Sequence, residues 1–212
     1  DVQPVKSDSS LVIPTNNESK KVEPNKIALE KLDDVLSPFE DMTESALNSN
    51  KNGVMKAMER VTEATKNNSF KNSISPEGQN LLMPKLDELK KAIDQTDYSQ
   101  IAMVSSEIFG LNIKHYVAAG AVENQIRVEH LDFAGYKTLA LLSQKTIDWN
   151  SVKQTVDEGQ KAYLVLKPKV KNGNLTDTFD YLFNGLTLGT ANKDVKMNKI
   201  LANMDLTLVD VL

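Results

Sequence analysis

Both histidines of the chain lie in one short stretch, HYVAAGAVENQIRVEH. His115 ends a helical stripe of apolar residues, so its ring is predicted to face the interior near the end of that helix. His130 shares a helical face with Glu123, and Glu129 lies beside it. Glu107 precedes His115 by two helical turns. Imidazole and carboxylate groups that meet at a turn between helices could bind a divalent metal such as zinc or iron.

The spacing of these residues does not match that of the usual metal site in a helical bundle. Such sites carry a Glu-x-x-His pair on one helix, whereas Glu129 and His130 are adjacent and diverge by about 100°. The sequence therefore favours a core histidine satisfied by a carboxylate or a backbone carbonyl, at a hinge between two halves of a bundle. The alternative is a metal- or haem-binding bundle protein that uses His115 and His130 with nearby carboxylates. No cofactor is predicted in the favoured interpretation.

The segment LDFAGYKTLALLS, residues 131–143, carries apolar side chains on more than one face of a helix. Burial on two sides is typical of a central helix that touches both parts of a molecule. The alternative is that Phe133 and Tyr136 line a groove for a ligand or a protein partner.

Composition excludes several classes of function. A formal charge of −4 argues against a nucleic-acid-binding protein, which needs a basic face. The absence of cysteine excludes thiolate metal sites, thiol catalysis and disulfides. No apolar run approaches the roughly 18 residues of a membrane span, and neither a glycine-rich phosphate loop nor a nucleophile elbow is present. No catalytic residue is predicted, and a non-enzymatic protein is favoured.

Apolar residues recur every three or four positions from about Lys26 onward, which predicts an almost wholly α-helical protein. Asp97-Tyr98, Asp148-Trp149 and Asp194-Val195 each join an acidic N-cap to the first apolar residue of a helix. Asn52-Gly53-Val54 is a weaker fourth instance. Since each cap follows another helix closely, it marks the turn of an αα-hairpin. The predicted hairpins cover residues 26–66, 77–116, 124–166 and 175–212.

About eight helices in four hairpins are expected to pack as one or two antiparallel four-helix bundles. A short α-solenoid is the alternative, because the hairpins repeat at about the period of known helical repeats. We expect three parts: a disordered leader or stalk at 1–25, a first helical half at 26–118 and a second at 119–212.

The polar, proline-dotted start of the chain and the absence of cysteine predict an exported protein, periplasmic or secreted, whose signal peptide has been removed. A lipid anchor upstream of residue 1 is a further option. The function predicted from the sequence is that of a binding or interaction module, which takes a protein partner or a small ligand in a crevice between helices.

Overall fold

The computed structural model describes residues 24–212, so most of the predicted leader at 1–25 lies outside the described residues. The described part of the chain is all-α, as predicted, with an isolated bridge between Ile74 and Tyr116 as its only β-type pairing. No helix in it is long and apolar enough to cross a membrane. The helices are α1 (Pro24–Leu47), α2 (Lys51–Lys66), α3 (Asn68–Ser73), α4 (Pro76–Asp94), α5 (Tyr98–His115), α6 (Glu123–Leu142), α7 (Trp149–Leu166), α8 (Gly173–Ala191) and α9 (Val195–Val209).

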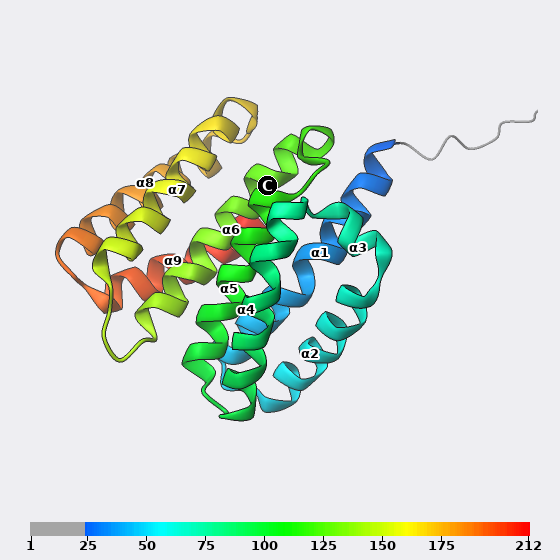
Figure 1. Ribbon diagram of the computed structural model, residues 1–212. Coiled ribbons are helices and arrows are strands. Elements are labelled where there is room, and N and C mark those ends of the chain that lie inside the picture. The colour runs from blue at the N-terminus through cyan, green and yellow to red at the C-terminus, as the bar shows by residue number, and fades with distance from the viewer. Residues whose placement is uncertain (1–23) are drawn as a thin grey trace, which may run out of the picture.

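The four predicted hairpins are present as α1/α2, α4/α5, α6/α7 and α8/α9 (Figure 1). Short helical segments connect them: α3, and the 3-10 turns Ala119–Val122 and Lys167–Lys169. Helix α3 was not predicted. It begins where the Asn67 side chain accepts a hydrogen bond from the N–H of Ser69. The helix is too short to show a repeated apolar stripe in the sequence.

The same tight turn closes three of the hairpins. Ser49, Thr96 and Lys193 adopt the left-handed backbone conformation, with φ of 51°, 53° and 55°. In each turn the next residue accepts a hydrogen bond through its side chain from the N–H three positions further on. Its own N–H donates to the carbonyl five positions earlier. This reversal satisfies the free carbonyls of one helix and the free N–H groups of the next.

The predicted N-caps Asp97, Asp148 and Asp194 are confirmed. In the first hairpin the prediction was wrong in detail, because the cap is Asn50 rather than Asn52. The Asn50 side chain accepts a 3.0 Å hydrogen bond from the N–H of Gly53, so α2 starts before the glycine.

Helices α6 to α9 form a four-helix bundle, in which α6 packs against α7 and α9, and α8 packs against the same two helices. The N-terminal helices pack in the order α2, α1, α5, α4, and both α1 and α5 contact α6. Figure 1 shows α6 lying between the two groups.

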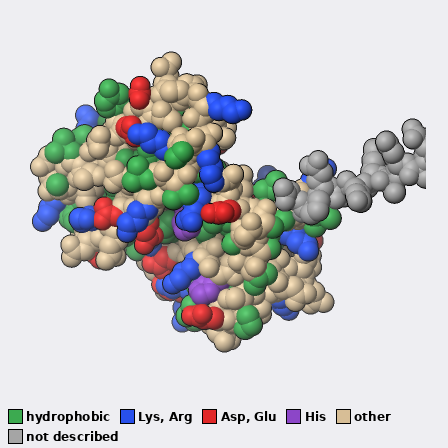
Figure 2. Space-filling view, turned by 90° about the horizontal axis from the view of Figure 1, so that it is seen from above, with side chains coloured by type: hydrophobic (Ala, Val, Ile, Leu, Met, Phe, Trp, Pro, Cys, Tyr) green, Lys and Arg blue, Asp and Glu red, His purple; other side chains and the backbone are tan. Residues whose placement is uncertain are grey.

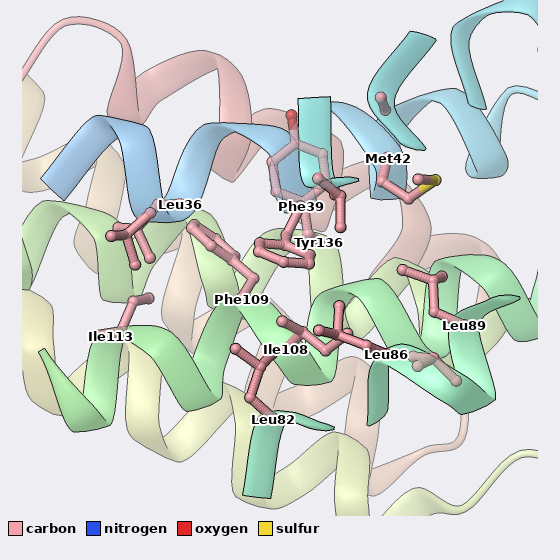
Figure 3. Packing of buried hydrophobic residues seen from close by; sticks show 14 of the residues in the cluster. Leu36, Phe39, Met42, Leu82, Leu86, Leu89, Ile108, Phe109, Ile113 and Tyr136 are labelled. Atoms are coloured by element: carbon pink, nitrogen blue, oxygen red, sulfur yellow. The ribbon is translucent and has the colours of Figure 1, made fainter. Parts of the chain in front are cut away.

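The hydrophobic core has two clusters that meet at α6. Tyr136 and Ala140 belong to the cluster formed with α1, α4 and α5, whereas Leu131 and Leu141 belong to the cluster formed with α7, α8 and α9. Figure 3 shows Tyr136 in the first cluster, close to aromatic side chains from α1 and α5. Because α6 contributes to both clusters, the division into halves at residues 118 and 119 stays a prediction.

Candidate functional site

Three helices that are remote in sequence bring six carboxyl groups to one region of the surface, and four of these groups line one hollow. On α1 the acidic residues are spaced by seven and four positions, which places them on one helical face. On α6 two acidic residues are three positions apart, and the last carboxyl lies at the C-cap of α9. We call this surface the acidic groove; its acidic residues are Asp33, Glu40, Glu44, Glu129, Asp132 and Asp210.

A glycine allows α6 and α9 to approach closely beside the groove. A Cβ atom at Gly135 would lie 2.7 Å from a methyl carbon of Leu206 and 3.3 Å from the carbonyl oxygen of Ala202. The close approach brings the C-terminal end of α9 next to Asp132, so that Asp132 and Asp210 line the same hollow.

The hollow in the acidic groove has a volume of about 270 Å³. Four carboxyl groups line it, together with the leucines Leu47, Leu139 and Leu206, and no lysine or arginine does. The remaining lining residues are Asn48, Tyr136, Asn203 and Thr207. Its wall therefore combines acidic and apolar groups, without a basic side chain to neutralise the acids.

Burial and the charges of neighbouring acids raise the pKa values of Glu40, Glu129 and Asp132. Burial, and then the charges of Glu40 and Glu129, raise the pKa of Asp132 from 3.8 to about 9. Burial, and then the charges of Glu129 and Asp33, raise the pKa of Glu40 from 4.5 to about 7. Within residues 24–212, none of the six acidic residues of the groove forms an ion pair. A bound cation would lower these pKa values and favour the ionised carboxyl groups.

Tyr136 presents an unbonded phenol to this hollow. Its side chain is 8% exposed and lines the cavity. The other strongly buried phenols, those of Tyr116 and Tyr163, donate to backbone carbonyls, whereas the Tyr136 hydroxyl bonds to no residue that the structure describes. Burial, and then the charges of Glu40 and Glu44, raise its pKa. The hydroxyl is not sealed from solvent, so it is free to form a hydrogen bond with a ligand in the hollow.

A second unpartnered polar group lies on α9. Asp205 is 0% exposed, and neither of its carboxyl oxygens has a hydrogen-bond partner. Burial raises its pKa well above the usual value, and its charge also contributes to the raised pKa of Asp132. A buried carboxyl group without a hydrogen-bond partner lowers the stability of the folded protein, and Asp205 is such a group.

A larger hollow of about 970 Å³ adjoins the groove and shares Asp132 and Asp210 with it. Lys169 and Lys171 also line it, so its charge is mixed. The smaller hollow has a wall of one charge together with an unbonded polar group, and these features select it as the candidate site.

The two histidines that were considered as metal ligands lie outside the acidic groove. The Nδ1 atom of His115 is 3.1 Å from the hydroxyl of Ser75, and the His115 carbonyl accepts a 2.9 Å hydrogen bond from the N–H of Ser75. His115 therefore joins the end of α5 to the start of α4. His130 is half-buried on α6, where burial and the charge of Arg127 lower its pKa. Figure 2 shows histidine side chains at two separate places on the surface.

The predicted acidic ligands are also dispersed. Glu107 lies between Lys85 and Lys137, at 2.6 Å and 3.0 Å. Burial alone would raise its pKa, but the two lysines lower it. Glu123 is exposed in the first turn of α6, and of the predicted set only Glu129 belongs to the acidic groove. Within residues 24–212, no group of three or more histidine, aspartate or glutamate side chains is placed to hold a metal ion.

Phe133 and Tyr136, the two aromatic residues considered for a ligand or partner groove, lie in different places in the structure. Phe133 packs against α5, where a Cβ atom at Gly110 would clash with its ring, and its ring centroid is 6.5 Å from that of Phe109. Tyr136 lines the hollow. Sequence reasoning missed Glu40, Glu44 and Asp210, although their α1 spacing was a usable signal for the first two.

No protein-family model matches the chain, and no curated protein or solved structure is significantly similar to it.

Proposed function

We propose that the protein is a non-enzymatic binding protein that holds a small organic cation in the acidic groove. The observation that carries this proposal is the unbonded phenol of the largely buried Tyr136, which lines the hollow together with four carboxyl groups. Such a site offers hydrogen-bond acceptors and negative charge, and it lacks a cation of its own.

The wall of the hollow favours an organic cation in particular. A cation beside Glu40 and Asp132 would offset the burial and the neighbouring negative charges that raise their pKa values. Leucine side chains in the same wall would pack against hydrocarbon. At about 270 Å³ the hollow lies just below the usual size of small-molecule sites and is too small for a docked helix.

The predicted export of the protein belongs to this proposal. A chain without cysteine suits an oxidising compartment, where free thiols are a hazard. Fractionation of cells that produce the protein from its own gene tests the location: recovery in the periplasm or the medium supports export, and recovery with the cytoplasm contradicts it.

The experiment that tests the binding function is thermal unfolding at pH 8 and constant ionic strength. Butylammonium, arginine ethyl ester or spermidine chloride replaces sodium chloride. We expect at least one of these cations to raise the Tm of the wild type above its value in sodium, since a ligand that binds the folded state stabilises it. The Asp132→Asn variant should gain less. The Asp87→Asn variant, changed at an exposed site on α4, should behave as the wild type does. No gain with any organic cation would refute the proposal.

A further inference from the structure

Two hollows meet at Asp132 and Asp210 and together follow α6. The smaller hollow reaches Leu139 and is lined by Tyr136, whereas the larger one, of about 970 Å³, reaches Asn124 at the start of the helix. The start of α6, the end of α9 and the segment between α7 and α8 surround the larger hollow (Figure 1). A ligand whose cationic group lies in the smaller hollow can therefore extend along α6 into a larger space.

The wall of the larger hollow has negative charge at one end and positive charge at the other. Its acids, Asp132 and Asp210, are those that it shares with the smaller hollow, and its basic residues are Lys169 and Lys171. The Nζ atom of Lys169 donates a 2.6 Å hydrogen bond to Oδ1 of Asn124, which holds this lysine at the first turn of α6. Asn124 and Asp132 are eight residues apart, a separation of about 12 Å at the rise of an α-helix.

A ligand with charges of both signs and an apolar part suits this wall. Within residues 24–212, neither Lys169 nor Lys171 forms an ion pair, and both side chains are exposed. Apolar side chains from α6, α7, α8 and α9 also line the larger hollow: Val128, Leu166, Leu175 and Val209. An anionic group at the lysines and a hydrocarbon part against these side chains would both find complementary surface.

Side-chain amides in the larger hollow offer the hydrogen bonds that a peptide backbone needs. Asn124, Gln125 and Asn172 line it. Asn124 and Asn172 accept hydrogen bonds through their oxygen atoms, and Gln125 donates one through its nitrogen. The amide nitrogens of Asn124 and Asn172 and the amide oxygen of Gln125 bond to no residue that the structure describes. They can donate to peptide carbonyls and accept from a peptide N–H, which a simple alkylamine does not offer.

Resting on the proposed function, we propose that the ligand is a short peptide, with its ammonium terminus in the smaller hollow and its carboxylate at Lys169 and Lys171. The ammonium group lies at the Tyr136 hydroxyl and donates to carboxyl oxygens of that hollow. An extended chain covers about 3.3 to 3.6 Å for each residue, so about four residues join the two ends of the wall. A free amino acid cannot do so, because both of its charged groups are attached to one carbon atom.

Calorimetric titration at pH 7 and constant ionic strength tests the peptide assignment. The probes are the tetrapeptide Ala-Leu-Leu-Ala with free termini, its C-terminal amide, and butylammonium chloride. The protein has a formal charge of −4, so charge alone would favour the amide, which has lost the negative carboxylate. We expect the opposite order: the free peptide should bind about fivefold more tightly than the amide, an effect of the size of one exposed ion pair.

Three variants place the two ends of the ligand. Lys169→Gln combined with Lys171→Gln should reduce the affinity for the free peptide to that for the amide. It should leave the amide and butylammonium unchanged, since salt at about 0.15 M screens charge beyond about 8 Å. Asp132→Asn should weaken the binding of all three probes. Lys161→Gln, changed at an exposed site on α7 that lines neither hollow, is the control and should behave as the wild type does.

The outcomes separate this inference from the proposed function. An amide that binds as tightly as the free peptide, or a free peptide whose affinity is unchanged in the combined lysine variant, would overturn the peptide assignment. Butylammonium binding that is weakened in Asp132→Asn would still support the site for an organic cation. Binding of none of the three probes would overturn both proposals. An equal loss in Lys161→Gln would reveal a non-specific charge effect and also overturn the assignment.

Discussion

Replacement of Asp132 by asparagine should stabilise the protein at neutral pH. The pKa of Asp132 is raised from 3.8 to about 9 by burial and by neighbouring acids, so at pH 7 the group is protonated when folded and ionised when unfolded. Its contribution to stability is present below pH 3.8 and is lost as the pH rises toward 9. Asparagine has the same shape and does not ionise.

The size of the effect follows from the difference between the assay pH and the unfolded pKa. Holding the folded carboxyl group neutral costs about 1.4 kcal/mol for each pH unit above that value. At pH 7 the cost is about 4 kcal/mol, and at pH 4 it is below about 1 kcal/mol. Asp132→Asn should therefore raise the free energy of unfolding by up to about 4 kcal/mol at pH 7 and change it little at pH 4.

Urea unfolding followed by far-ultraviolet circular dichroism at both pH values measures this difference. Asp87→Asn is the matched control, because Asp87 is exposed on α4 and makes only a 3.5 Å contact with Lys90; it should change stability by less than about 1 kcal/mol. A destabilised Asp132→Asn at pH 7, or an equal gain at both pH values, would refute the reasoning.

Four further predictions concern other parts of the molecule. Asp205→Leu should stabilise the protein at pH 7 by about 1 to 3 kcal/mol, because it removes a buried carboxyl group without partners; a lower urea midpoint would contradict this. Thr96→Gly should stabilise by roughly 1 kcal/mol, since threonine has a φ of 53° in its turn, and Thr96→Ala should give no such gain in the same assay. Gly159→Ala should lower the Tm, because the new Cβ would lie 2.6 Å from the Cβ of Ala134; an unchanged Tm would show that α6 and α7 can separate. Spermidine affinity should rise from pH 5 to pH 8 as Glu40, with a pKa of about 7, becomes ionised, and calorimetry that showed a constant affinity would exclude this coupling.

The fold could be predicted because its signals are local. Asp97, Asp148 and Asp194 each cap a helix through bonds to residues two or three positions away, so the sequence contains both the cap and the stripe that follows. The cap of α2 was predicted at Asn52 rather than at Asn50, because Gly53 was taken to mark the start of the helix. In the structure Gly53 lies in the first turn of α2.

The site could be predicted only in part, because its residues meet through long-range packing. Tyr136 was singled out by the two-sided apolar pattern of its helix. Its acidic neighbours Glu40 and Asp210 come from the first and last described helices, and no local pattern pairs them. The histidines were conspicuous in sequence, yet His115 serves to join two helices through Ser75.

The central claim is that an organic cation binds at the Tyr136 phenol, and a nuclear magnetic resonance titration tests it most directly. The chain has five tyrosines, so protein labelled with ¹³C in tyrosine rings gives a simple spectrum. Addition of spermidine at constant ionic strength should shift the Tyr136 resonance, assigned with Tyr136→Phe, and leave the other four in place. A Tyr136 resonance that stays unmoved at saturating spermidine would contradict the account.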